Sequence, residues 1–186
     1  MCLSLLYPDA LADSVFALDF PALKSLGFRG LIFDIDNTLV PHGADATPEV
    51  EALFSRLEAL GFRVFFVSDN GPDRIRRFLT HIPGDFIDNA HKPLPGAYRR
   101  AVKALGLPRR EVLVIGDQIF TDVLGARLAG LHPILVRFIG WQTDPNPGKR
   151  RAVEARLLAR WAKKRRTHLQ TQLEAATYET TTEALL

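Results

Sequence analysis

Short runs of apolar residues recur along the chain, separated by longer segments of mixed character. Four runs are continuous rather than alternating, at residues 30–33, 63–67, 112–115 and 133–136, and a weaker apolar segment lies at residues 86–87. Continuous runs of this length are typical of strands that are buried on both faces of a parallel sheet. The pattern therefore predicts the strands of a mainly parallel sheet.

The segments between these runs carry the signals of helix ends. Thr47 suits the cap of a helix and Gly61 suits its end, since glycine readily adopts the left-handed conformation found there. Helices are predicted over residues 48–60, 72–79, 95–106 and 119–129. Strands that alternate with helices predict a doubly wound α/β fold. In such a fold, ligands bind at the carboxyl ends of the strands.

Composition narrows the class of protein. Of the 186 residues, 47% are apolar, which lies within the range of globular proteins. No segment approaches the roughly 18 consecutive apolar residues of a membrane-spanning helix, and residues 1–6 lack a basic leader. Cys2 is the only cysteine, which excludes an internal disulfide and a cysteine zinc cluster. These features predict a cytoplasmic protein.

Charge is distributed unevenly along the chain. The net charge is only +3, but residues 149–166 hold nine lysines and arginines against the single acid Glu154. A turn-rich break at residues 144–148 separates this basic segment from the apolar runs. We therefore expect a domain over residues 1–145 and a basic helical extension with a frayed end over residues 146–186.

Two pairs of carboxylates follow the predicted strands. Asp34 and Asp36 come after the first run, and Asp117 and Asp122 come after the third. In a pair at a strand end, one carboxylate can attack as a nucleophile while its neighbour transfers protons. Oxygen ligands from both pairs could bind Mg²⁺. The alternative is that these residues only cap loops and helices, where Asp is common.

Phosphate-binding groups follow the other strand ends. Ser68 ends the second run, and the loop at residues 69–71 places backbone amides at a helix N-terminus, a natural cradle for phosphate. Lys92, in a loop beside Pro93, can neutralise phosphoryl oxygens. The alternatives are an ordinary turn and a solvated lysine. We expect the Asp69 carboxylate to point away from the site and to cap the following helix.

Taken in this order, the motifs resemble those of the haloacid dehalogenase-like (HAD) phosphohydrolases, which are Rossmann-like enzymes. The residues that carry the resemblance are Asp34, Asp36 and Thr38, then Ser68, then Lys92 with Pro93, then Gly116 and Asp117 with Asp122. Residues 31–39 and 116–123 resemble the class IIIA branch, and within it the YqeG-type phosphatases. The resemblance covers residues 5–139, with no room for an inserted cap domain.

The resemblance implies a role for each matching residue. Asp34 would attack phosphorus to give an aspartyl-phosphate, and Asp36 would protonate the leaving oxygen and then activate water. Mg²⁺ would bind Asp34, the backbone carbonyl of Asp36, and Asp117, with support from Asp122. Ser68 and Lys92 would hold the phosphoryl oxygens, and the expected substrate-binding set also includes Thr38, Asp69 and Asn70.

The basic segment at residues 149–166 gives an indication of the kind of substrate. Val153, Leu157, Leu158 and Trp161 recur at helical spacing among basic residues, and a cationic amphipathic helix of this kind can lie on an anionic membrane. YqeG-type proteins are similar to phosphatases of phosphatidylglycerophosphate, a phospholipid. Three alternatives stay open: binding to nucleic acid with action on polynucleotide ends, a small-molecule substrate, and a helix that packs on the domain or on a partner.

Two functions of another class compete with the enzyme. A receiver-like signalling domain also phosphorylates an aspartate, but it carries that aspartate after its third strand, whereas here the Asp34 motif follows the first predicted strand. A non-catalytic scaffold or binding protein with the same fold is disfavoured by the complete set of Asp34, Asp36, Ser68, Lys92 and Asp117.

Overall fold

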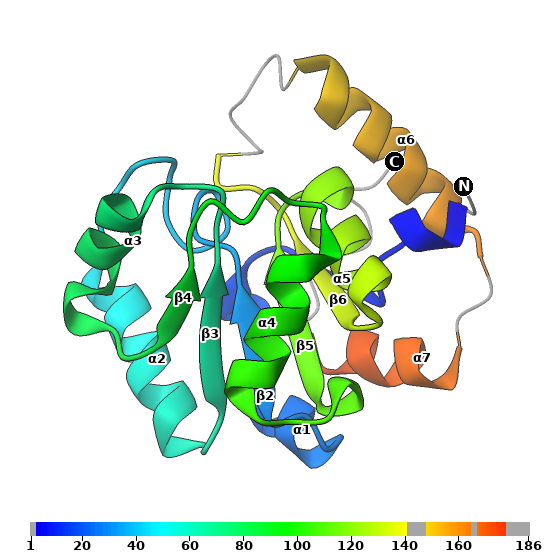
Figure 1. The fold of residues 1–186 in the computed structure, drawn as a ribbon. Helices are drawn as coiled ribbons and strands as arrows, with labels where there is room; N and C mark the ends of the chain where they lie inside the picture. The colour runs from blue at the N-terminus through cyan, green and yellow to red at the C-terminus, as the bar shows by residue number, and fades with distance from the viewer. Residues whose placement is uncertain (1–2, 141–147, 165–166, 178–186) are drawn as a thin grey trace.

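The computed structural model describes residues 3–140, 148–164 and 167–177. In these ranges six strands form one parallel sheet, in the order β1-β6-β5-β2-β3-β4 (Figure 1). The strands are β1 (Ala10–Ala12), β2 (Gly30–Phe33), β3 (Arg63–Val67), β4 (Asp85–Ile87), β5 (Val112–Gly116) and β6 (His132–Val136). The parallel sheet predicted from the apolar runs is confirmed, with β1 as an additional edge strand.

Helices cover both faces of the sheet, as a doubly wound fold requires. The α-helices are α1 (Phe20–Ser25), α2 (Pro48–Ala59), α3 (Pro72–Phe78), α4 (Pro95–Leu105), α5 (Leu124–Ala129), α6 (Gly148–Ala162) and α7 (His168–Ala175). Short 3₁₀ turns lie at η1 (Leu3–Leu6), η2 (Val15–Ala17), η3 (Leu79–His81) and η4 (Arg109–Glu111), and a π-helical turn lies at η5 (Ile119–Val123). The last predicted helix therefore begins with this π turn and becomes α-helical only at Leu124.

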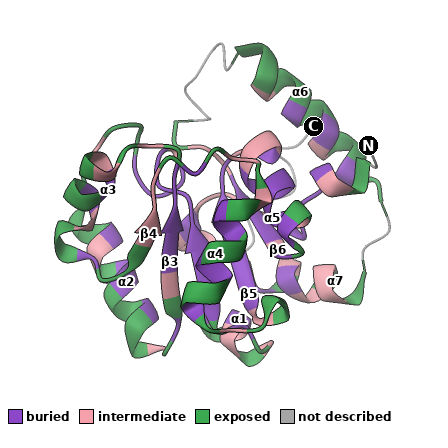
Figure 2. Ribbon diagram, in the orientation of Figure 1, coloured by how far each residue is buried: buried purple, intermediate pink, exposed green. Residues whose placement is uncertain are grey.

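Two large apolar clusters lie on opposite faces of the sheet, and a third, smaller cluster includes Leu6, Leu124 and Leu157. Figure 2 shows the buried residues in purple. Along β2, Leu31 and Phe33 face the layer that contains α1, α2, α3 and α7, whereas Ile32 faces the layer that contains α4 and α5. Successive side chains of a strand point to opposite faces, so a strand with helices on both sides must be apolar throughout. This explains why β2 reads as a continuous apolar run.

The order of the strands places the site. The chain moves outward from β2 to β3 and β4, then returns to the other side of β2 with β5 and β6. The direction of winding reverses between β2 and β5, where Phe33 pairs with Ile115. Ligands of doubly wound folds bind in the crevice at such a reversal. The residues that follow these two strands, from Asp34 and from Asp117, therefore lie next to each other.

Helix α6 packs on the domain near the N-terminal segment (Figure 1). Its inward side buries Glu154, Leu157 and Trp161, and the Trp161 indole donates a 2.9 Å hydrogen bond to the backbone oxygen of Pro8. Its basic residues Lys149, Arg156 and Arg160 are exposed away from this inward side, and we call them the outer face of α6. Leu157 and Trp161 of the predicted apolar stripe therefore contact the protein itself, as one of the three alternatives expected, whereas Val153 is exposed.

Some sequence predictions fall outside the described ranges. These are the chain break at residues 144–147 with its domain boundary at residue 145, the frayed end after Thr177, and Cys2. Within the described ranges, no helix combines the length and the apolar character that crossing a membrane requires.

Candidate active site

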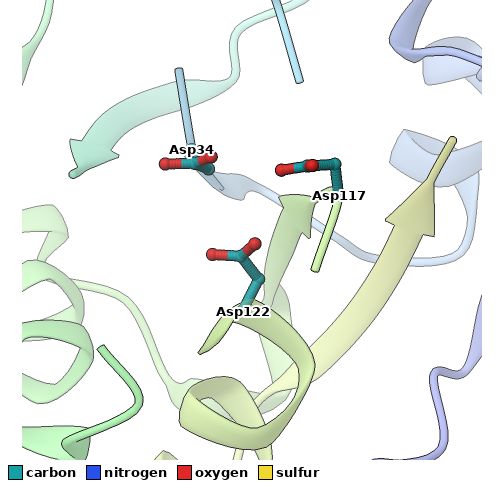
Figure 3. A group of neighbouring side chains, drawn as sticks. All are labelled: Asp34, Asp117 and Asp122. Atoms are coloured by element: carbon teal, nitrogen blue, oxygen red, sulfur yellow. The ribbon is translucent and has the colours of Figure 1, made fainter. Parts of the chain in front are cut away.

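Three buried carboxylates meet at the carboxyl ends of β2 and β5. Asp34 follows β2, Asp117 follows β5, and Asp122 lies in the π turn after β5. One oxygen from each lies within 4.8 Å of the other two, and the side chains point toward a common space (Figure 3). The strand order brings the first two together, and the tight turn between Asp117 and Asp122 adds the third.

Lys92 is buried among these carboxylates. Its ammonium nitrogen lies 2.6 Å from Oδ1 of Asp34 and 2.8 Å from Oδ1 of Asp122. Burial alone would lower the pKa of Lys92, but the carboxylates of Asp122 and Asp34 outweigh it and raise that pKa well above its ordinary value. The Tyr98 hydroxyl lies 3.4 Å from the same Asp122 oxygen. The lysine is therefore charged when it meets a ligand.

The electrostatics of the cluster favour a bound cation. Burial raises the pKa of Asp34 to about 7, with Lys92 opposing the rise and Asp122 and Asp117 adding to it. Burial and the Asp122 charge raise the pKa of Asp117 to about 6, with Arg151 opposing. Buried carboxylates that repel one another are stabilised by a divalent cation, and an all-oxygen ligand set is the one that Mg²⁺ prefers. The residues present therefore fit a magnesium site.

Thr38 lies between two of the carboxylates. Its hydroxyl is 3.2 Å from Oδ1 of Asp117 and 3.4 Å from Oδ2 of Asp34. One hydroxyl can donate only one hydrogen bond at a time. Thr38 therefore links the ends of β2 and β5 and keeps one oxygen of Asp117 on the side of Asp34.

Asp36 lies apart from the carboxylate cluster and has its own partners. Its carboxylate accepts hydrogen bonds from Asn70 (2.7 Å), Arg74 (2.9 Å) and the Gly43 backbone (3.2 Å), and the His42 ring lies 3.1 Å away. Burial would raise the pKa of Asp36, but the bonds from Asn70, Gly43 and Arg74 together lower it. The resting protein therefore holds Asp36 in its ionised form.

Ser68 and Asn70 form a second polar group beside Asp36. Ser68 is 1% exposed, and its hydroxyl accepts hydrogen bonds from the Asn70 backbone (3.2 Å) and side chain (2.9 Å). The Asn70 amide thus contacts both Ser68 and Asp36. Of the residues expected to bind phosphate, Ser68 and Asn70 lie near Asp36, whereas Thr38 and Lys92 lie near Asp34.

Asp69 does not cap the following helix, so that expectation is wrong. The N-cap of α3 is Gly71, which has no side chain to bond with. The Asp69 carboxylate instead accepts a 2.9 Å hydrogen bond from the backbone nitrogen of Lys92. It reaches across to the neighbouring loop because Lys92 follows β4, which lies beside β3 in the sheet. Asp69 therefore fixes the loop that carries Lys92.

Two arginines that were not among the predicted site residues also contact the site. Arg74 of α3 pairs with Asp36, and Arg151 of α6 pairs with Asp117. Both lie on helices, where an arginine ordinarily indicates a solvated charge. A signal was available for Arg151, because it falls on the same helical stripe as Glu154, Leu158 and Trp161.

The chain is similar in sequence to known hydrolases. The family model described as haloacid dehalogenase-like hydrolase matches residues 41–130. The chain is 36% identical to "Probable phosphatase YqeG" of Bacillus subtilis, over 88% of this chain and 94% of that protein. It is 27% identical to the chloroplastic phosphatidylglycerophosphate phosphatase 1 of Chlamydomonas reinhardtii, over 85% of this chain and 63% of that protein.

Two further similarities are more distant. A glyceraldehyde 3-phosphate phosphatase of Pyrococcus abyssi is 26% identical, over 49% of this chain and 42% of that protein. Among solved structures, an uncharacterized protein from Listeria monocytogenes serotype 4b aligns with a TM-score of 0.50 at 19% identity, over 64% of this chain and 85% of that one. The structural match supports the fold alone.

Proposed function

This chain belongs to the haloacid dehalogenase-like hydrolases and is a phosphatase, and we propose that it hydrolyses a phosphomonoester with Asp34 as its nucleophile and with Mg²⁺ as its cofactor. The observation that carries the proposal is the position of Asp34. It lies at the strand reversal, within 4.8 Å of the metal-ligand candidates Asp117 and Asp122, and 2.6 Å from the Lys92 ammonium.

The first half of the reaction transfers the phosphoryl group to the enzyme. An Asp34 carboxylate oxygen attacks phosphorus, the bond from phosphorus to the substrate oxygen breaks, and Asp36 gives that oxygen a proton. Asn70 and Arg74 hold Asp36 ionised in the resting protein. The negative charge of a bound phosphate favours the protonated form of Asp36, which the transfer needs.

The second half releases phosphate. Asp36, now ionised, takes a proton from water while that water attacks the phosphorus of the aspartyl-phosphate, and the bond to the Asp34 oxygen breaks. Lys92, Ser68 and Thr38 neutralise or hydrogen-bond the phosphoryl oxygens, with Asn70 beside them and Asp69 fixing the Lys92 loop. Asp34, Asp117 and the Asp36 carbonyl, with Asp122 in support, would hold a magnesium ion, which would supply positive charge beside these oxygens.

The substrate that we propose is phosphatidylglycerophosphate, at the inner surface of an anionic membrane. Relatives named as phosphatases of this lipid are 27% and 26% identical to the chain. The described residues hold no inserted cap domain over the site, which leaves room for a bulky substrate. The outer face of α6 supplies cations, each contributing about 1 kcal/mol near an anionic surface.

Catalysis by Asp34 is tested with an aryl phosphate. The full chain is assayed with and without Mg²⁺, beside Asp34→Asn and the matched variant Asp73→Asn, whose carboxylate is 99% exposed on α3. We expect Mg²⁺-dependent turnover that Asp34→Asn removes and Asp73→Asn keeps. Equal turnover in the wild type and in Asp34→Asn would disprove the mechanism.

The substrate is tested by competition among three classes. The value of kcat/KM is compared for phosphatidylglycerophosphate in mixed micelles, for glyceraldehyde 3-phosphate, and for an oligonucleotide with a terminal phosphate. We expect the lipid to be preferred by at least about tenfold, or 1.4 kcal/mol in transition-state binding. A preference for glyceraldehyde 3-phosphate would favour the function named for the Pyrococcus relatives. A preference for the oligonucleotide would indicate that the outer face of α6 binds nucleic acid.

A further inference from the structure

Helix α6 contributes Arg151 to the site, although Arg151 lies 34 positions after Asp117 in the chain. One terminal nitrogen of the Arg151 guanidinium donates a 2.6 Å hydrogen bond to the backbone oxygen of Asp117. The other terminal nitrogen pairs with Oδ2 of the same residue. One rigid, planar group therefore binds both the main chain and the side chain of Asp117, which a lysine ammonium cannot do with the same geometry.

Two neighbours hold Arg151 in this position. Glu154 lies one turn along α6, and its Oε2 accepts a 3.1 Å hydrogen bond from the nitrogen that also binds the Asp117 backbone. The other oxygen of Glu154 accepts a 2.9 Å hydrogen bond from the backbone of Ile119. On another side, the Arg151 guanidinium stacks 4.6 Å from the centre of the Phe138 ring. Glu154 is 4% exposed, so this network is buried.

The network fixes which oxygen of Asp117 faces the site. Arg151 takes Oδ2, and Thr38 lies 3.2 Å from Oδ1, on the side of Asp34. A carboxylate that lost Arg151 could rotate and exchange its two oxygens, or turn away with its loop. Partners of this kind orient metal-binding carboxylates, and removing them commonly lowers metal affinity by about 10–100-fold.

We propose that Arg151 is a positioning residue that presents Oδ1 of Asp117 to a divalent cation, so that the C-terminal helix α6 is part of the metal site. This inference rests on the proposed magnesium function of Asp117. Arg151 could instead compete with the cation for Asp117, because a guanidinium repels a cation. A competing Arg151 would weaken metal binding, whereas a positioning Arg151 strengthens it. The two roles therefore predict opposite changes when Arg151 is removed.

The test is the Mg²⁺ affinity of the full chain, measured by titration calorimetry without substrate. Arg151→Gln is compared with the wild type, with Arg151→Lys, and with Arg156→Gln, which removes the same charge from the outer face of α6. We expect the dissociation constant to rise at least about tenfold in Arg151→Gln, less in Arg151→Lys, and not in Arg156→Gln. An unchanged or tighter constant in Arg151→Gln overturns the proposal.

The docking of α6 is followed separately through Trp161. The protein has two tryptophans, so a Trp141→Phe background leaves Trp161 as the reporter. We expect its emission to stay unchanged on Mg²⁺ addition, because metal and Arg151 bind Asp117 together. An Mg²⁺-induced red shift, which indicates that α6 leaves the domain, contradicts this. If Arg151→Gln shifts the Trp161 emission even without Mg²⁺, the substitution has loosened α6. The Mg²⁺ affinity of Arg151→Lys then tests the proposal, since this variant keeps the charge that pairs with Asp117.

Failure of the magnesium site is distinguishable from failure of this inference. If Asp117→Asn binds Mg²⁺ as tightly as the wild type, the proposed metal site is wrong and the role of Arg151 falls with it. If Asp117→Asn loses Mg²⁺ while Arg151→Gln retains it fully, the metal site stands and only the positioning role is refuted.

Discussion

The ammonium of Lys92 lies 2.6 Å from the carboxylate of Asp34, and less than a tenth of either side chain is exposed. The same ammonium lies 2.8 Å from Asp122, so a single cation compensates two buried carboxylates from different strand ends. Charges that are buried together depend on one another, because removing one leaves its partners uncompensated. Lys92 therefore supports the cluster, in addition to the phosphate-binding role that we propose for it.

Replacing Lys92 tests this double role. We expect Lys92→Gln to lower kcat/KM toward an aryl phosphate by about 10²–10³, since one preorganised charge at a transferring phosphoryl group is removed. The free energy of unfolding should fall as well, because Asp34 and Asp122 lose their shared partner. Steady-state kinetics and urea unfolding measure the two effects. Lys103→Gln removes an exposed lysine from α4 and should change neither quantity.

Gly116 has no room for a side chain. A Cβ atom added there would lie 2.4 Å from Cγ and 2.6 Å from Cβ of Asp122, which is too close for any real contact. We expect Gly116→Ala to push Asp122 away from Lys92, to cost about 1–3 kcal/mol of stability, and to lower activity at least tenfold. Urea unfolding and kinetics measure both changes.

Gly96→Ala is the matched control for that variant. An added Cβ at Gly96 meets only the end of the Arg100 side chain, at 3.7 Å, near the start of α4. Alanine is a better helix residue than glycine by about 0.5–1 kcal/mol, so this variant should be slightly more stable and fully active. If Gly116→Ala behaves like Gly96→Ala, the tight approach of Asp122 does not matter for function.

The strands and the meeting of Asp34 with Asp117 could be predicted because both depend on local rules. Continuous apolar runs identify buried parallel strands, and the ends of such strands meet at one edge of the sheet. Strand β1 could not be predicted in this way. It has only three residues, Ala10–Ala12, and its extended form depends on pairing with β6 at the edge of the sheet.

The helical stripe marks Arg151 as an inward-facing residue, but the partners of the two arginines could not be predicted, because they depend on how whole helices are placed. Periodicity identifies the apolar stripe of α6, but it does not say what covers that stripe. Arg151 reaches Asp117 only because Trp161 and Leu157 anchor α6 to the domain. The partner of Asp69 could not be predicted for the same reason. Its carboxylate binds the backbone of Lys92, which lies 23 residues away on the loop after the neighbouring strand.

Asp36 is expected to matter most for substrates with a poor leaving group. A general acid contributes typically about 10²–10⁴-fold, and it contributes little where the leaving oxygen needs no proton. Asp36→Asn should therefore lose much more activity toward an alkyl phosphate than toward a nitrophenyl phosphate. The ratio of kcat/KM values for the two substrates measures this, because kcat/KM reports the transfer to Asp34 and not the second step, in which Asp36 activates water. An equal loss on both would show that Asp36 acts through structure rather than through proton transfer.

The outer face of α6 is expected to bind anionic vesicles. Reversing the charge of Arg156 and Arg160 replaces two exposed cations and should remove several kcal/mol of attraction, at about 1 kcal/mol for each charge near the surface. Sedimentation with phosphatidylglycerol vesicles should fall sharply, whereas turnover of a soluble aryl phosphate should not change. Binding that is equal in both proteins, or equal for neutral vesicles, would contradict the membrane assignment.

A buried carboxylate outside the candidate active site, that of Asp9, holds the N-terminal segment to the domain. Asp9 is 5% exposed, and it accepts hydrogen bonds from Arg127 at 2.7 and 3.1 Å and lies 3.0 Å from His132 and 3.4 Å from Gln170. Burial would raise the pKa of Asp9, but His132 and Arg127 outweigh burial and lower it. Asp9 therefore favours the folded state whenever it is ionised.

This lowered pKa gives the stability a defined dependence on pH. Because the pKa of Asp9 is lower in the folded chain than its ordinary 3.8, its contribution is complete above that value and is lost as the pH falls through the folded pKa. We expect Asp9→Asn to cost about 3 kcal/mol at pH ~7, since breaking a buried pair leaves Arg127 uncompensated. In urea unfolding, the difference from the wild type should shrink below pH ~4. The control Asp85→Asn, at an exposed position, should leave the free energy of unfolding unchanged at either pH. A stability cost of Asp9→Asn that does not depend on pH would show that packing rather than charge holds this segment.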